Sequence, residues 1–208
     1  ISVIYDGLSE CFDSFEYNFE TDKIIKTQYE LPDKYILCLS TLEPRKNIRL
    51  LVKAFDELIR EKQIDIDLVL AGRKGWLIND LLSGLDKSVV ERIHFTGFIE
   101  DEHLPYIYRN AELFVFPSVY EGFGVPPIEA MAMGVPVVSS NAASLPEILG
   151  RAAIYFENNN KNDLKNKMKL ALSMGENDRR IIKEIGIKQA HKFNWKTEAI
   201  KLKNTLFK

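Results

Sequence analysis

The sequence predicts an α/β fold built on a doubly wound parallel sheet, with a helical tail at the C-terminal end. Short apolar runs rich in β-branched and aromatic residues alternate with segments of helical periodicity along most of the chain. The runs are almost continuously hydrophobic, which is typical of strands whose sheet has helices on both faces. Such regular alternation indicates βαβ units, and hence a Rossmann-like sheet.

The expected elements follow one another in a simple order. The strands are expected at residues 35–40, 66–72, 92–97, 112–118, 135–140 and 152–156. The helices between them are expected at 48–63, 76–85, 102–110, 127–133 and 145–150, and those of the tail at 164–173, 178–192 and 195–207. The first helix carries an apolar stripe at helical spacing, formed by Leu51, Ala54, Phe55, Leu58 and Ile59.

The two ends of the chain differ from its middle. Residues 1–34 are turn-rich and weakly patterned, and we interpret them as a linker that leads into the core at residues 35–157. Residues 158–208 form the helical tail, and no internal repeat or long low-complexity linker divides the chain, so one compact domain is preferred to two. The start at Ile1 in place of Met predicts that the chain was cut from a longer protein.

Composition excludes several classes of protein. With 46% hydrophobic and 28% charged residues, the 208-residue chain has ordinary globular usage, and its net charge of −2 argues against a nucleic-acid-binding module. Two cysteines without a spacing pattern, Cys11 and Cys38, fit a reduced, cytoplasmic protein. No apolar stretch approaches the ~18 residues of a membrane span, so we expect at most peripheral contact with the inner membrane face.

The turn after the first expected strand carries two cations. In an open α/β sheet, ligands bind at the carboxyl ends of the strands, so the turns there are the places to search. Arg45 and Lys46 stand just before Asn47, which we expect to cap the following helix. Two cations beside a helix N-terminus suit a diphosphate. A solvated basic turn is the equally weighted alternative.

The turn after the fourth expected strand combines glycines with two carboxylates. Gly122 and Gly124 allow backbone amides to approach a ligand closely, and Glu121 and Glu129 bracket the loop. Carboxylates accept hydrogen bonds from sugar hydroxyls, so the loop suggests a polyhydroxylated ligand with a phosphate nearby. The alternative is that Glu129, expected in the first helical turn, only complements the helix dipole and that Glu121 is a surface acid.

The turn after the third expected strand is a weaker candidate. Main-chain groups of residues 97–101 could contact a nucleobase edge while Ile99 packs on the ring, and Asp101 is an expected N-cap. Most turns of this kind only reverse the chain.

Other motifs carry less weight. Asp65 and Asp67 have the spacing of a metal-binding DxD, but they lie at the start of their strand, away from the three turns. His94, His103 and His191 show no metal-ligand spacing. No Walker A motif is present and the third glycine of GxGxxG is missing after Gly124, so neither an ATPase nor a dinucleotide site is favoured.

The run EGFGVPPIE (121–129) resembles the E-x7-E signature of the family 4 retaining glycosyltransferases. The motifs TLEPRKN, LVLAGRKGW, IHFTGFIEDEHLPYIYRNAELFVFPS and EAMAMGVPVVSSNAASLPEILGRAAIYF stand in the family's order, so the resemblance is strong over residues 35–157. TLEPRKN is similar to the mannosyltransferase-like branch. The opening ISVIYDGLSECF resembles the family's approach to its C-terminal domain, with Asp6 where Asn is usual.

The resemblance implies one half of a GT-B fold, the half that binds a nucleotide sugar, with the acceptor-binding N-terminal domain missing. It implies no obligatory metal and no other cofactor, with GDP-mannose favoured as the donor and a UDP-sugar as the alternative. It places Arg45, Lys46 and Glu121 in catalysis. The substrate-binding residues that it implies are Thr41, Gly97, Phe98, Ile99, Leu104, Gly122, Phe123, Gly124, Val125 and Glu129.

Within that set the resemblance implies specific contacts. Lys46 and Arg45 would meet the diphosphate, and Arg45 would compensate for a cation that the family carries where this chain has Ser40-Thr41. Glu121 would meet the transferred sugar or its phosphate, and Glu129 the ribose hydroxyls. The amides of Phe123 and Gly124 would contact the sugar, and residues 97–99 would line the base.

The predicted function is therefore transfer of a hexose, with mannose favoured, from a nucleotide sugar to a glycan or lipid-linked acceptor in polysaccharide or cell-surface glycan synthesis. The isolated chain is expected to bind its donor without turnover. Two alternatives stay open: a non-catalytic nucleotide-sugar-binding or interaction module, and another GT-B enzyme such as a sugar-nucleotide epimerase or a phosphorylase.

Overall fold

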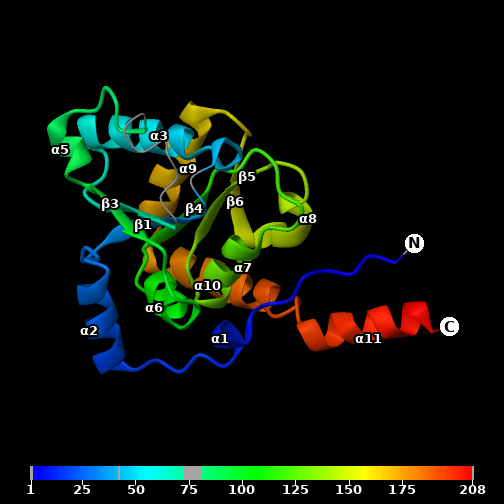
Figure 1. Ribbon diagram of the computed structural model, residues 1–208. Helices are drawn as coiled ribbons and strands as arrows, with labels where there is room; N and C mark the ends of the chain where they lie inside the picture. Colours follow the sequence, from blue (N-terminus) through cyan, green and yellow to red (C-terminus); the bar gives the residue numbers. More distant parts are fainter. Residues whose placement is uncertain (1, 42, 73–80, 208) are drawn as a thin grey trace.

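The computed structural model describes residues 2–41, 43–72 and 81–207 and contains one six-stranded parallel sheet (Figure 1). The strand order is β3-β2-β1-β4-β5-β6, and every neighbouring pair is parallel. This order is the doubly wound one, so the predicted Rossmann-like α/β class is confirmed. The strands are β1 (Tyr35–Leu39), β2 (Asp67–Ala71), β3 (Ile93–Gly97), β4 (Leu113–Phe116), β5 (Val137–Ser140) and β6 (Ala153–Phe156).

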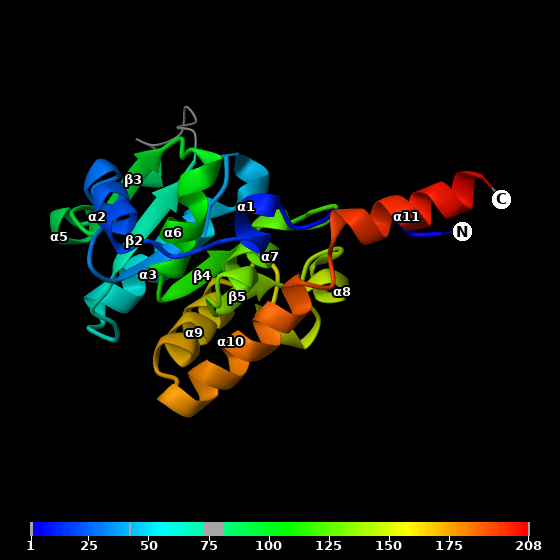
Figure 2. The same ribbon diagram turned by 90° about the horizontal axis from the view of Figure 1, so that it is seen from below.

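Helices cover both faces of the sheet (Figures 1 and 2). One face packs against α3 (Ile48–Arg60), α5 (Lys87–Val90) and α9 (Lys161–Leu172). The other packs against α1 (Glu10–Asp13), α2 (Phe19–Gln28), α6 (Leu104–Arg109), α7 (Val125–Ala132), α8 (Leu145–Leu149) and α10 (Glu176–Ala190). The remaining described elements are α11 (Trp195–Leu206) and three short 3-10 turns, Pro44–Lys46, Asp101–His103 and Gly150–Ala152.

Alternation along each strand divides the core in two. Successive side chains of a strand point to opposite faces. Tyr35 and Leu37 of β1 therefore join the core under α6 and α7, whereas Ile36 and Cys38 join the core under α3. All four side chains are buried, which explains why the sequence shows an unbroken apolar run at this position.

The region before residue 35 contains a helix that its pattern did not indicate. The side chain of Asn18 accepts a hydrogen bond from the Thr21 amide and caps α2, and Ile25 is buried against the core. Most other side chains of α2 are exposed, so the helix leaves only a weak apolar stripe in the sequence. Residues 73–80, where the first half of the helix expected at 76–85 falls, lie outside the described residues.

The chain changes direction between β1 and β4, and this switch positions the candidate site. From β1 the chain runs outward through β2 and β3, then returns to add β4, β5 and β6 on the other side of β1. The loops that leave β1 and β4 therefore lie side by side, where the Val119 amide donates to the Arg45 carbonyl at 3.0 Å. Ligands of doubly wound sheets bind at such a switch point.

The last helix, α11, projects from the body of the molecule next to the N-terminal segment (Figure 2). The Tyr5 amide donates to Glu198 of α11 at 3.1 Å, and the Leu8 amide donates to the Phe193 carbonyl at 2.9 Å. Large apolar side chains are exposed on both segments: Val3, Ile4, Trp195, Ile200, Leu202, Leu206 and Phe207. None of the described helices is long and apolar enough to cross a membrane.

Candidate functional site: a charged cluster at the switch point

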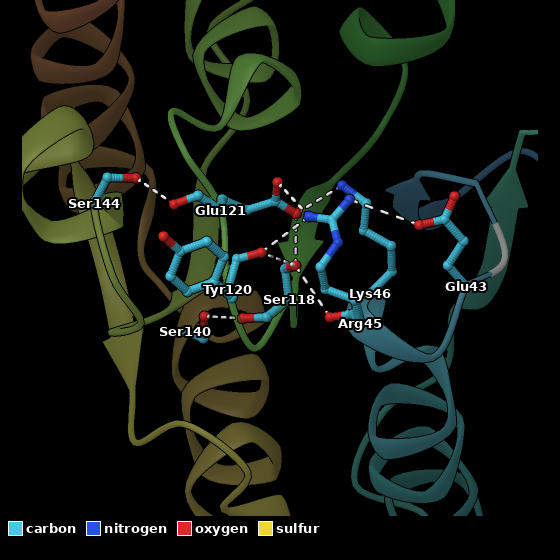
Figure 3. Close-up of polar contacts among 8 residues, drawn as sticks. All are labelled: Glu43, Arg45, Lys46, Ser118, Tyr120, Glu121, Ser140 and Ser144. Atoms are coloured by element: carbon cyan, nitrogen blue, oxygen red, sulfur yellow. Dashed lines mark hydrogen bonds and ion pairs between the residues drawn. The ribbon is translucent and has the colours of Figure 1, made fainter.

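The Glu121 carboxylate joins the two turns at the switch point (Figure 3). Its Oε1 accepts from Lys46 Nζ at 2.6 Å, and its Oε2 accepts from Arg45 Nη1 at 2.9 Å. Arg45 Nη1 also donates to the Tyr120 carbonyl at 3.0 Å, and its other terminal nitrogen lies 3.6 Å from Glu43. The two cations predicted after β1 and the first carboxylate predicted after β4 thus form one ion-pair cluster.

Three serines hold the loop that carries Glu121. The Ser118 hydroxyl donates to Glu121 Oε1 at 2.6 Å, and the Ser144 hydroxyl donates to the Glu121 carbonyl at 2.9 Å. The hydroxyl of Ser140, the last residue of β5, donates to the Ser118 carbonyl. These contacts fix both the main chain and the side chain of Glu121, and sequence reasoning missed them because a serine at a strand end has no distinctive pattern.

The cluster is partly shielded from solvent. The side chains of Lys46 and Glu121 are 14% and 11% exposed, whereas that of Arg45 is 44% exposed. The Lys46 ammonium also lies 5.4 Å from the centre of the Phe116 ring. Burial opposes ionisation of Glu121, but the hydrogen bonds from Lys46 and Ser118 outweigh it, so the pKa of Glu121 lies below its ordinary value. The carboxylate is therefore ionised at neutral pH.

The glycine loop after Glu121 leads into α7. Gly122 is exposed, and a β-carbon there would meet no atom within 4 Å. Gly124 has φ +103°, and a β-carbon there would lie 2.7 Å from Leu145, so the backbone needs glycine at this position. The Phe123 ring packs edge-on against Phe193 at 5.1 Å. Val125, another predicted contact, is the first residue of α7.

The second predicted carboxylate, Glu129, lies in the second turn of α7 and is only 8% exposed. The helix begins at Val125, before the expected residue 127, so the expected first-turn position is wrong and simple dipole complementation does not explain Glu129. The Tyr108 hydroxyl donates to Glu129 Oε2 at 2.8 Å. Burial raises the pKa of Glu129 to about 7; the Tyr108 hydrogen bond opposes this rise and the charge of Asp101 adds to it.

The turn after β3 is held by Tyr29, the residue that follows α2. Tyr29 Oη accepts from the Glu100 amide at 3.3 Å and lies 3.0 Å from His103 Nδ1. Gly97 has φ +73°, a conformation that favours glycine. Sequence reasoning missed Tyr29 because its helix lies in the weakly patterned region.

The remaining predicted contacts around this turn have different exposures. Phe98 is 53% exposed, whereas the Ile99 side chain is 4% exposed and belongs to the core. This burial gives the Ile99 side chain a packing role and leaves its main chain for the predicted ligand contact. Thr41 is exposed just after β1, and Leu104 is half-buried at the start of α6.

Of the two expected helix caps, Asn47 has the predicted position without the capping hydrogen bond, and Asp101 is wrong. Asn47 occupies the residue before α3 with φ +54°, but its side chain makes no capping hydrogen bond; its Nδ2 donates to Asn159 at 3.0 Å. Asp101 lies inside a 3-10 turn, and Glu100 precedes that turn. At Asp101 the chain passes through the 3-10 turn Asp101–His103 before α6, so His103 and not Asp101 precedes the α-helix.

The discounted DxD residues lie at the amino end of β2. Arg92 binds both of them, through Asp67 Oδ1 at 2.9 Å and Asp65 Oδ1 at 2.7 Å. His94 contacts the other oxygen of Asp67 at 2.7 Å. Among the residues that the structure describes, no group of three or more His, Cys, Asp or Glu side chains could hold a metal ion.

The chain is similar to known proteins both in sequence and in fold. The family model described as glycosyl transferases group 1 matches residues 20–189. The O-antigen chain mannosyltransferase B of Escherichia coli is 40% identical over 162 residues, which is 77% of this chain and 42% of that protein. The chain spans less than half the length of the first curated relatives that it matches.

Solved structures share the fold. A glycosyltransferase from Rickettsia africae ESF-5 aligns with a TM-score of 0.86 at 22% identity, covering 98% of this chain and 56% of its own. Anabaena Alr3699/HepE, solved in complex with UDP and glucose, aligns with a TM-score of 0.80 at 19% identity, covering 99% of this chain and 56% of its own.

Proposed function

The chain belongs to the glycosyl transferases group 1 family, and from this premise we propose that it is the donor-binding domain of a retaining hexosyltransferase. The observation that carries the proposal is the charged cluster at the switch point, in which Lys46, Arg45 and Glu121 meet. We favour mannose as the transferred sugar and GDP as the leaving group because the Escherichia coli relative is a mannosyltransferase. A UDP-sugar is the alternative donor.

The cations of the cluster have a chemical role in this proposal. Departure of a nucleoside diphosphate from the sugar builds negative charge on the leaving oxygen, and preorganised cations stabilise such charge. Lys46 and Arg45 supply two positive charges beside the strand ends, and Glu121 fixes both of them before the donor arrives. Diphosphate binding then shares these cations with Glu121, whose carboxylate also lies within reach of the sugar. The departing phosphate takes the proton of the acceptor hydroxyl.

The donor's other parts fall on the loops around the cluster. We assign the sugar hydroxyls to the amides of Phe123 and Gly124, the ribose hydroxyls to Glu129, and the base to residues 97–99. This scheme assigns no metal to the site, and Lys46 and Arg45 make the contacts to the diphosphate. The acceptor is a glycan or a lipid-linked glycan, and the cytoplasmic location with peripheral membrane contact stays a prediction from the sequence.

We propose further that turnover needs an N-terminal domain that binds the acceptor. Two observations support this: curated relatives are more than twice as long as the part that this chain matches, and α11 exposes apolar side chains such as Trp195 and Leu206. Burial of such side chains stabilises an interface by about 1.5–3 kcal/mol each. A gene extended upstream should transfer mannose from GDP-mannose, whereas the 208-residue chain should bind the donor alone.

Calorimetric titration of the 208-residue chain with GDP, GDP-mannose, UDP and ADP tests the proposal. We expect one of the guanosine ligands to bind tightest. Lys46→Ala should weaken binding by about 1.5–3 kcal/mol because it removes a charge-assisted contact. Lys183→Ala, on the exposed side of α10, is the matched control and should bind as the wild type does.

Three outcomes would contradict parts of the proposal. Binding of none of the four ligands at millimolar concentration would remove the nucleotide-sugar site. Unchanged affinity in Lys46→Ala would remove Lys46 from it. Release of a free sugar epimer, or dependence of the reaction on inorganic phosphate, would indicate an epimerase or a phosphorylase. NMR assignment of the anomeric configuration of the product tests the retaining mechanism.

A further inference from the structure

Tyr108 has an unusual environment for a polar side chain. It lies in α6, its side chain is fully buried, and its ring packs against Phe12 at 5.7 Å and Phe114 at 5.4 Å between ring centres. Packing on both sides fixes the ring, so its hydroxyl has one available direction. That hydroxyl donates to Glu129 Oε2 at 2.8 Å.

The hydrogen bond distinguishes the two oxygens of Glu129. Within the described ranges, Tyr108 is the only hydrogen-bond donor that contacts this carboxylate, and it takes Oε2. The same residues bury only two side-chain polar atoms without a partner, Ser40 Oγ and Asn158 Oδ1. Glu129 Oε1 therefore has no donor among those residues and keeps access to solvent, so it is the oxygen that can accept from a ligand.

We propose that Tyr108 is the positioning residue of the nucleotide site: it favours the carboxylate form of Glu129 and orients it so that Oε1 accepts from the ribose hydroxyls of the donor. This inference rests on the proposed function and adds an explanation of how the buried carboxyl group of Glu129 can carry a charge. The geometry assigns the task to a side chain that does not itself touch the ligand.

Charge around Glu129 explains why such support is needed. Burial and the negative charge of Asp101 both disfavour the carboxylate form, and no cation among the described residues is paired with it. Cys11 of α1 is a further titratable group within electrostatic reach, and it is neutral because burial raises its pKa. Tyr108 is thus the one group facing Glu129, in the part of the chain that is described, that favours its charged form.

The test compares binding of GDP and 2′,3′-dideoxy-GDP between pH 5.5 and pH 8.5. The wild type should prefer GDP by about tenfold or more at pH 8, since a hydrogen bond to a charged acceptor has about that effect. The preference should fall as Glu129 takes up a proton near pH 7. Tyr108→Phe should bring the preference close to one at pH 7 and move its midpoint to higher pH.

Tyr106→Phe is the matched control, because Tyr106 lies in the same helix and makes no contact with Glu129. It should keep the wild-type preference and pH profile. The double variant Tyr108→Phe/Glu129→Gln should bind as Glu129→Gln does, because Tyr108 acts only through Glu129.

The outcomes separate the inference from the proposed function. Absence of GDP binding by the wild type overturns both. A wild type that binds GDP without a ribose preference overturns the assignment of Glu129 and the role of Tyr108. A Tyr108→Phe variant with the wild-type preference and pH midpoint overturns the role of Tyr108 alone. If that variant is too unstable to titrate, a pH-independent ribose preference in the wild type overturns the inference equally.

Discussion

Replacing Glu129 with glutamine should make the chain more stable above neutral pH, although Glu129 is assigned to the nucleotide site. The fold buries this carboxyl group and raises its pKa from 4.5 to about 7. A folded-state pKa above the unfolded value means that the folded chain holds the proton more tightly. Protonation of Glu129 therefore stabilises the folded chain relative to the unfolded one. This stabilisation is complete below about pH 4.5 and is lost as the pH rises through about 7.

The shift sets the size of the effect. A difference of about 2.5 between the two pKa values corresponds to about 3 kcal/mol at 1.36 kcal/mol per unit. Glutamine keeps an oxygen that can accept from Tyr108 but has no charge to bury. We therefore expect Glu129→Gln to unfold like the wild type at pH 4 and to be about 3 kcal/mol more stable at pH 8.5.

Urea unfolding of both proteins across this pH range measures the difference directly. Glu184→Gln is the control, because it makes the same chemical change at an exposed position of α10. Its difference from the wild type should stay small at every pH. A Glu129→Gln difference that does not grow between pH 4.5 and pH 7.5 would refute the reasoning, since the buried charge would then have no cost.

Three further changes have defined outcomes. Gly72→Ala should destabilise the fold by at least ~3 kcal/mol in urea unfolding. The reason is that Gly72 has φ +127° and that a β-carbon there would lie 2.2 Å from the Ser40 carbonyl oxygen. Near-wild-type stability would mean that the backbone relaxes there. Tyr29→Phe should cost about 1 kcal/mol and speed amide exchange in the turn after β3, and unchanged exchange would contradict this role. Iodoacetamide should label Cys11 but not Cys38 in the native chain, because Cys38 is buried and burial raises its pKa to about 12. In urea it should label both cysteines. Equal labelling of the two cysteines in the native chain would contradict this prediction.

The parallel sheet and the turns that carry the charged cluster could be predicted because they follow from regular features. Unbroken apolar runs indicated a parallel sheet, and the turns that leave its strands contained Lys46 and Glu121, which the fold brings to 2.6 Å. The contacts that hold this pair were not predictable. The Ser118 hydroxyl reaches Glu121 three residues further on, and the Ser144 hydroxyl reaches it across 23 residues. Nothing in the local sequence of either serine marks such a partner.

Local rules failed where tertiary packing decides the conformation. The Asn47 side chain was expected to cap α3, but it reaches Asn159 in the loop after β6 instead. Glu129 was expected near the first turn of its helix because the prolines suggested a later start. No sequence pattern singled out the buried Tyr108, since its hydroxyl contact depends on how α6 packs beside α7.

The strand order also has a kinetic consequence. Lys46 and Glu121 are 75 residues apart in sequence, and β2 and β3 with their connections lie between them. Local βαβ units form contacts of short range, whereas pairing of β1 with β4 must close a long loop and is expected to be slow. During refolding, the Lys46–Glu121 ion pair therefore reports closure of the sheet, and helical signal should recover before any affinity for a diphosphate does.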